Sequence, residues 1–243
     1  MERWDMGTMT ASLDASEAMQ AIQWPTPHSA GEASQSWPRL GSPLRLGVMA
    51  SGQGSNFEAL VRACRGGPLN AEVVQLVVNN PVCGARQRAK RLGIPCHLHD
   101  HRDHSLRQDL DRQVAASFAA SDVDLVVMAG WMRIVTPVLI AAYPGRLVNI
   151  HPSLLPSFRG LDAVGQALAA GVTLTGCTAH LVEEVVDAGP ILVQAAVPVL
   201  RSDDHGSLAA RIQAQEHRIL PYAVALAALR LDQAGAATSA IQG

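Results

Sequence analysis

Short apolar runs alternate with segments of helical periodicity along most of the chain, beginning at Leu44. Several runs are apolar at nearly every position, as in 123–130, and this pattern is typical of strands buried on both faces of a parallel sheet. Strands that alternate with helices in this way predict an open α/β sheet with helices on both faces. The predicted strands are 44–50, 71–80, 95–100, 123–130 and 146–152, and the predicted helices between them are 56–65, 83–93 and 105–121.

The order of the predicted elements changes after residue 152. A helix at 162–171 is followed by strands at 175–184 and 190–199, and a long helix around 207–230 comes last. The two late strands have only a short connection between them, which suits antiparallel pairing. We therefore predict a parallel, Rossmann-like N-terminal half of the sheet, with antiparallel strands added in the C-terminal half.

Residues 1–43 differ in composition from the rest of the chain. They are rich in Ser, Ala, Pro, Thr and Gly, and they end in the turn-forming sequence WPRLGSP. This composition predicts a disordered N-terminal extension at 1–43 in front of one domain at 44–243. Three of the four tryptophans, Trp4, Trp24 and Trp37, lie in the extension, which leaves a docking or partner-binding role open.

Charge and cysteine content narrow the class of ligand. The 19 basic and 21 acidic residues are scattered, with a net charge of −2, so the chain lacks the basic surface typical of nucleic-acid binders. The four cysteines have no paired metal-ligand spacing, and the histidine-rich segment 97–104 is interpreted as a polar surface loop. No apolar run reaches the roughly 18 residues of a membrane span. We expect a cytoplasmic protein that acts on small molecules, without nucleic-acid, membrane or metal partners.

The sequence ASGQGSN at 50–56 joins the first predicted strand to the first predicted helix. Glycines there allow the backbone to approach an anion, and a helix N-terminus favours phosphate. The segment lacks the third glycine of the dinucleotide-binding pattern G-x-G-x-x-G, so the sequence favours a phosphate over NAD. A plain tight connection with Ser55 or Asn56 as the helix N-cap is the alternative interpretation.

The sequence AGWMRIVTP at 129–137 follows the predicted strand at 123–130. Open α/β sheets bind ligands at the carboxyl ends of their strands. Main-chain groups of Met132 to Val135 are therefore candidates for pairing with a planar heterocycle. An ordinary loop without a ligand is the alternative.

Asn149 and His151 alternate with apolar residues in the predicted strand LVNIHP. A strand's period of two places both side chains on one face, at the edge where ligands bind. An amide donor beside an imidazole suits acyl transfer, in which a carbonyl oxygen becomes negative and protons must move. Asp187, before a turn, is placed to orient a histidine from a neighbouring strand. The alternative is that these polar residues are structural.

The segments SGQGSN, AGWMRIVTP, NIHPSLLPSFRG and VDAGP occur in this order and closely resemble the phosphoribosylglycinamide formyltransferases, folate-dependent enzymes of purine biosynthesis. The resemblance extends from about Leu44 to about Leu231. It implies the formyltransferase-type open twisted sheet. It also implies transfer of the formyl group of 10-formyltetrahydrofolate, as a co-substrate, to the amine of 5'-phosphoribosylglycinamide (glycinamide ribonucleotide). The resemblance is compatible with a monomer and with a homodimer.

The resemblance also implies roles for individual residues. His180 follows the family pattern near the site, whereas Val164 stands where the family commonly has a histidine. The implied catalytic residues are Asn149, His151 and Asp187; the ribonucleotide-binding residues are Gly54, Ser55, Asn56 and Glu216; and the folate-binding residues are Arg107, Met132, Arg133, Ile134, Val135 and Asn149.

Three other functions share part of this pattern. Formyltetrahydrofolate deformylase and methionyl-tRNA formyltransferase share the Asn, His and Asp residues. The first carries an N-terminal regulatory domain, for which the 43 breaker-rich residues are insufficient, and the second needs a C-terminal domain beyond the residues that follow Leu231. A non-catalytic nucleotide-binding module is the alternative outside enzymes, and the intact catalytic trio argues against it.

Overall fold

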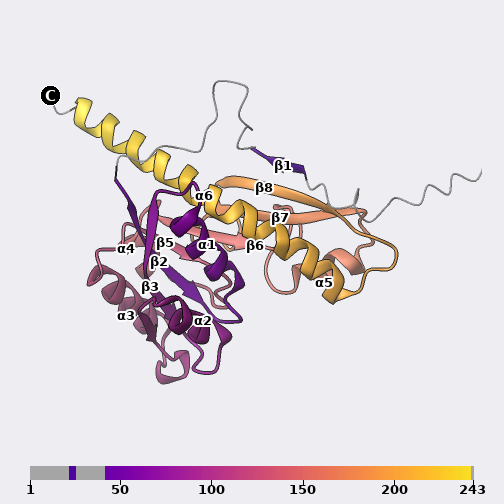
Figure 1. Ribbon diagram of the computed structural model, residues 1–243, viewed down its shortest axis with the longest axis horizontal. Helices are drawn as coiled ribbons and strands as arrows, with labels where there is room; N and C mark the ends of the chain where they lie inside the picture. The colour runs from indigo at the N-terminus through magenta and orange to yellow at the C-terminus, as the bar shows by residue number, and fades with distance from the viewer. Residues whose placement is uncertain (1–21, 26–41, 242–243) are drawn as a thin grey trace, which may run out of the picture.

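The structure, a computed structural model, describes residues 22–25 and 42–241, which form one sheet covered by helices on both faces (Figure 1). The strand order is β1-β8-β7-β6-β5-β2-β3-β4. This arrangement confirms the predicted α/β class. The strands are β1 (Ile22–Trp24), β2 (Leu44–Ala50), β3 (Ala71–Val78), β4 (Cys96–Leu98), β5 (Leu125–Met128), β6 (Leu147–His151), β7 (Leu174–Leu181) and β8 (Ile191–Pro198).

The direction of strand pairing changes at β6. β6 pairs in parallel with β5 and antiparallel with β7, while β2, β3, β4 and β5 pair in parallel and β7, β8 and β1 antiparallel. Asn149 is aligned with Met128 on one side and with His180 on the other. The predicted parallel half and antiparallel additions are thus confirmed, and Asn149 lies at the boundary between them.

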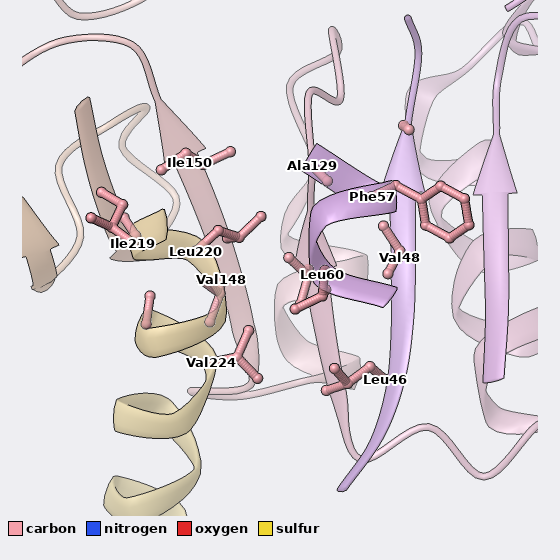
Figure 2. Close-up of a cluster of buried hydrophobic side chains, with 14 of the residues drawn as sticks. Leu46, Val48, Phe57, Leu60, Ala129, Val148, Ile150, Ile219, Leu220 and Val224 are labelled. Atoms are coloured by element: carbon pink, nitrogen blue, oxygen red, sulfur yellow. The ribbon is translucent and has the colours of Figure 1, made fainter. Parts of the chain in front are cut away.

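Alternate residues of the parallel strands β2, β3 and β5 enter different cores on the two faces of the sheet. Leu46 and Val48 point toward α1 and α6, as Figure 2 shows, whereas Met49 packs with Phe118 of α3 on the opposite face. This alternation explains why the inner strands are apolar at successive positions. The helices are α1 (Ser55–Gly66), α2 (Gly84–Leu92), α3 (Arg107–Ala119), α4 (Pro137–Ala142), α5 (Ala163–Ala169) and α6 (His205–Ile241), with a 3₁₀ helix at His101–Asp103.

Helix α6 crosses the face formed by β6, β7 and β8 and also contacts α1 (Figure 1). Its central residues Ile219, Leu220 and Val224 are fully buried. Pro221 lacks an N–H group and cannot make an intrahelical bond there. The helix nevertheless continues through Pro221, because the surrounding residues are packed in the core.

Four features of the fold differ from the predicted elements or were not predicted. The short helix α4 and the 3₁₀ helix were not predicted. β7 ends at Leu181, before the predicted end of its strand at residue 184, and Asp187 lies in the following loop. Ile22–Trp24, within the expected extension, pairs with β8, whereas residues 1–21 and 26–41 lie outside the described residues.

Two kinds of feature are absent from the described part of the chain. None of its helices is long and apolar enough to cross a membrane. Among the same residues, no group of three or more His, Cys, Asp or Glu side chains is placed to hold a metal ion.

Candidate active site

A cavity of about 820 Å³ lies at the carboxyl ends of β2, β5 and β6. Its lining comes from the segments after these strands, the loop after β7, and one side of α6. All the residues that the resemblance implicated line this cavity: Gly54, Ser55, Asn56, Arg107, Met132, Arg133, Ile134, Val135, Asn149, His151, Asp187 and Glu216. Their side chains or main-chain atoms therefore face one common space.

One end of the cavity is formed by the N-terminus of α1. Gly54 is the N-cap residue, with a left-handed φ of 75°, and no side chain caps the helix. The interpretation of Ser55 or Asn56 as the N-cap is therefore wrong. A Cβ atom at Gly54 would lie 2.7 Å from the Cβ of Ala85, so glycine alone fits. The first N–H groups of the helix have no intrahelical acceptor and are available to an anion.

Asn56 and Glu216 join α1 to α6 beside this helix terminus. The Nδ2 of Asn56 donates to the Oε2 of Glu216 at 2.8 Å, and both residues are buried. Burial raises the pKa of the Glu216 carboxyl, and the bond from Asn56 offsets part of this effect. Gln213 also lines the cavity. It was not predicted, although its position three residues before Glu216 places it on the same side of the helix.

Asn149 and His151 extend from the same face of β6 and line the cavity. The Nδ2 of Asn149 lies 3.1 Å from the Nε2 of His180, the residue aligned with it on β7. The Nδ1 of His180 is 2.8 Å from the carbonyl oxygen of Leu181. The side chain of His180, anchored on this carbonyl, lies against the amide of Asn149 and fixes its orientation.

The two ring nitrogens of His151 have different partners. Nε2 is 2.8 Å from the carbonyl oxygen of Phe158, which can only accept, so Nε2 carries a proton. Nδ1 lies 3.3 Å from the Oδ2 of Asp187. The ring thus faces the carboxylate through Nδ1. The side chain of His151 is largely buried, and this limits its exchange with bulk water.

Asp187 is held by main-chain and side-chain groups on both of its oxygens. Its Oδ2 accepts from the N–H of Gly160 at 2.9 Å, and its Oδ1 lies 3.6 Å from the Nε2 of His180. Burial alone would raise the pKa of this carboxyl. The contact with His180, the bond from Gly160 and the adjacent His151 outweigh burial and lower the pKa below its usual value. Asp187 is thus a carboxylate at neutral pH.

Another part of the cavity wall is formed by the segment from Met132 to Val135. The side chains of Met132 and Ile134 are 66% and 53% exposed, and they give this part an apolar surface. The N–H of Met132 donates to the Oγ of Ser51 at 2.9 Å. The N–H of Thr136 donates to the Oδ2 of Asp111. The roles of Ser51 and Asp111 in holding this segment were not predicted, because both residues lie outside it in the sequence.

Asp111 connects this segment to α3. It lies one helical turn after Arg107, which lines the cavity, and it is buried. Burial raises the pKa of the Asp111 carboxyl, with the bonds from Thr136 as the opposing effect. A single buried side chain thus fixes the segment after β5 relative to the helix that carries Arg107.

Val164 lies in the first turn of α5, where the resemblance led us to expect a histidine. It is buried in the core cluster and also contributes to the cavity lining. Nearby, Asp162 caps α5 and accepts from the N–H of Gly165, and its Oδ1 is 3.0 Å from the Nε2 of His205. Polar contacts at this rim therefore come from Asp162 and His205 of this chain.

The cavity combines three chemical environments in one space. An uncapped helix terminus suits a phosphate, and the segment from Met132 to Val135 offers an apolar surface with main-chain donors and acceptors. Asn149, His151 and Asp187 lie along the same lining. An amide donor, together with an imidazole in contact with a carboxylate, supplies the groups that acyl transfer to an amine requires.

Comparisons with known proteins agree with this geometry. Residues 44–224 match the family model described as formyl transferase. The chain is 44% identical over 184 residues to phosphoribosylglycinamide formyltransferase of Mycobacterium tuberculosis (strain CDC 1551 / Oshkosh), an alignment that covers 76% of this chain and 85% of the relative.

A similar level of identity is found to a longer protein and to a solved structure. The chain is 44% identical over 184 residues to the trifunctional purine biosynthetic protein adenosine-3 of Drosophila melanogaster, covering 75% of this chain but spanning only 14% of that relative. The crystal structure of glycinamide ribonucleotide transformylase 1 from Symbiobacterium toebii superposes with a TM-score of 0.76 at 42% identity, covering 82% of this chain and 93% of that one.

Proposed function

This chain belongs to the formyl transferase family, and on that premise we propose that it transfers a formyl group from 10-formyltetrahydrofolate to the amine of glycinamide ribonucleotide. The products are 5'-phosphoribosyl-N-formylglycinamide and tetrahydrofolate. The observation that carries the proposal is the single cavity in which the α1 N-terminus, the trio Asn149, His151 and Asp187, and the segment from Met132 to Val135 all take part.

The two substrates are assigned to different parts of the cavity lining. The phosphate of the ribonucleotide binds the N–H groups at Gly54, Ser55 and Asn56, and Glu216 contacts the ribonucleotide beside them. The pteridine ring pairs with the main chain of the segment from Met132 to Val135, and Arg107 binds the folate at the edge of the cavity. The exposed side chains of Met132 and Ile134 support this assignment, because an apolar surface suits a flat heterocycle.

The first chemical step forms the new N–C bond. The uncharged glycinamide amine attacks the formyl carbon, and the carbonyl oxygen becomes negative. The second N–H of Asn149 donates to this oxygen, and the positive charge of protonated His151 stabilises it. The contacts that fix the Asn149 amide on His180 and the Nε2 of His151 on Phe158 support this role, because preorganised donors stabilise developing charge.

The second step breaks the bond between the formyl carbon and N10 of the folate. The amine nitrogen loses one proton and N10 gains one, so the reaction is balanced without a net change in protons. Asp187, ionised and in contact with Nδ1 of His151 at 3.3 Å, accepts the proton through an ordered water and returns it to N10. No covalent enzyme intermediate is required, since the amine is itself the nucleophile.

The proposal is tested by following tetrahydrofolate release from 10-formyltetrahydrofolate in a spectrophotometric assay. We expect release that depends on glycinamide ribonucleotide and is stoichiometric with formylation of its amine. Release without the ribonucleotide would instead indicate a deformylase. No release under either condition would indicate a nucleotide-binding module and contradict the proposal.

The setting of the reaction follows from the substrates. Both are soluble small molecules, so we propose that the protein acts in the cytoplasm without a nucleic-acid or membrane partner. The proposed catalytic residues of one chain line a single cavity, and this supports an active site that a monomer can form.

A further inference from the structure

We propose that Arg88, held by the buried carboxylate of Glu58, positions the phosphate-binding loop 52–56 and thereby determines the affinity for the phosphorylated substrate. Neither residue lines the cavity. The inference rests on the proposed function, because it assigns a task to the loop that binds the ribonucleotide phosphate. Arg88 is accordingly a positioning residue and not a catalytic one.

The carbonyl groups of the loop are bound by helix α2. The oxygen of Gly52 accepts from the N–H of Ala85 at 3.1 Å, and the oxygen of Gln53 accepts from the Nε of Arg88 at 2.7 Å. In a trans peptide the carbonyl and the N–H of the next residue point in opposite directions. Holding these two oxygens on α2 therefore directs the N–H groups of Gln53 and Gly54 away from α2.

Glu58 fixes the guanidinium group of Arg88. The side chain of Glu58 is only 7% exposed although it lies in the first turns of α1. Its Oε2 accepts from the Nη1 of Arg88 and, at 2.6 Å, from the Nη2 of Arg91. Burial opposes ionisation, but the arginines outweigh it and lower the pKa of Glu58. The carboxylate is thus charged and holds the Arg88 fork in one orientation.

Arg88 differs from the other arginines around Glu58 because it also binds the loop, at the carbonyl of Gln53. Arg62 and Arg91 bind the same carboxylate with side chains that are 75% and 62% exposed, while Arg88 is 32% exposed. A guanidinium has donors on both edges of a rigid plane. Arg88 uses one edge for Glu58 and its Nε for Gln53, so a single planar group links the buried charge to the loop.

The test compares steady-state kinetics of Arg88→Ala, Arg88→Lys and Glu58→Gln with those of the unmodified protein. Losing a charge-assisted hydrogen bond corresponds to roughly 10- to 100-fold in affinity. We expect Arg88→Ala to raise the KM for glycinamide ribonucleotide by about tenfold or more, with kcat and the KM for 10-formyltetrahydrofolate changed by less than about threefold. Arg88→Lys and Glu58→Gln should give intermediate values, because each keeps part of the link.

A second measurement separates loop positioning from general destabilisation. The same variants are assayed with ribosylglycinamide, the acceptor without its phosphate. The preference for the phosphorylated acceptor should fall in parallel with the rise in KM, because only the phosphate uses the loop. Arg65→Ala is the matched control, since Arg65 also joins α1 to α2 by donating to the carbonyl of Leu92 at 2.7 Å. This substitution should leave the KM for glycinamide ribonucleotide and the preference for the phosphorylated acceptor unchanged.

Three results would overturn the inference. The first is an unchanged KM for glycinamide ribonucleotide in Arg88→Ala. The second is an equal rise in the KM values for glycinamide ribonucleotide and for 10-formyltetrahydrofolate. The third is a rise in the KM for glycinamide ribonucleotide in Arg65→Ala as large as that in Arg88→Ala. If Arg88→Ala does not fold, the milder Arg88→Lys and Glu58→Gln give the same comparison. A failure of the proposed function is distinct, because the unmodified protein would then show no turnover that depends on the ribonucleotide.

Discussion

At the scale of single residues, His151 shows how one side chain is prepared for two tasks. The carbonyl of Phe158 fixes the proton on Nε2, and Asp187 faces Nδ1. Asn149 is similarly fixed on one side by His180, with its other N–H left for substrate. Each donor is therefore oriented before the substrate arrives, so little reorganisation is needed in the transition state.

The residue-scale prediction concerns these two donors. We expect Asn149→Ala or His151→Ala to lower kcat by about 10²- to 10³-fold, the usual effect of losing an oxyanion donor. The Kd for the folate should change far less, because the donors act mainly on charge that develops during the reaction. Stopped-flow kinetics and equilibrium titration with folate measure the two quantities separately.

A histidine outside the cavity provides the control for these variants. His97 is exposed on β4, and His97→Ala should leave kcat unchanged. If purified Asn149→Ala and His151→Ala turned over at the rate of the unmodified protein, the catalytic assignment would be wrong.

Some of these residue contacts could be predicted from the sequence and others could not. The period of two in a strand places Asn149 and His151 on one face, as the structure confirms. The main-chain carbonyl of Phe158 gives no signal in the sequence. Asp187 reaches the site from a loop with a left-handed φ of 51°, and such a backbone path is decided by tertiary contacts.

At the scale of elements, the start of α6 is held by a charge network. Asp203 precedes the helix and accepts from both terminal nitrogens of Arg211, from the Oγ of Ser207 and from the N–H of Leu200. The bond from Arg211 is the main cause that lowers the pKa of Asp203 to about 2. Its side chain is only 3% exposed, so solvent screens the interaction little.

The element-scale prediction follows from the sign of this shift. A carboxyl whose pKa is lower in the folded state stabilises the fold at pH values above its unfolded pKa, and the effect is lost as pH falls through the folded pKa. Asp203→Asn should lower the free energy of unfolding by about 2 kcal/mol at pH 7. The difference should nearly disappear near pH 2, as urea titrations at both pH values would show.

An exposed pair is the control for that comparison. Asp109 binds Arg112 on α3 with side chains that are 43% and 58% exposed, so Asp109→Asn should change the free energy by less than about 1 kcal/mol. A deficit in Asp203→Asn that is equal at pH 7 and pH 2 would contradict the electrostatic account.

Short elements explain most of the differences between the predicted and observed fold. Helix α4 has only six residues, too few for apolar periodicity, although Thr136 as N-cap and Pro137 in the first turn are helix-start signals. β1 has three residues and depends on pairing with β8. Long elements such as β2 and α3 were predicted to within two residues at each end, because their periodicity is sustained.

At the scale of the whole molecule, the cavity lies where the parallel half of the sheet meets the antiparallel half. β6 is the shared strand, and its polar residues project at this junction. The alternating strands and helices predicted both halves. The pattern did not predict the strand order or the long-range partners of the loops, since these depend on contacts between residues far apart in the chain.

The bond between Asn56 and Glu216 joins the first helix of the domain to the last, across a separation of 160 positions. Contacts between such distant residues form late, because a long loop must close before they contribute. The ribonucleotide end of the cavity is therefore expected to assemble last when the protein refolds from urea. Activity should recover more slowly than far-UV ellipticity, and coincident recovery of the two signals would contradict this order. During synthesis, a nascent chain would have no ribonucleotide site until α6 has emerged from the ribosome.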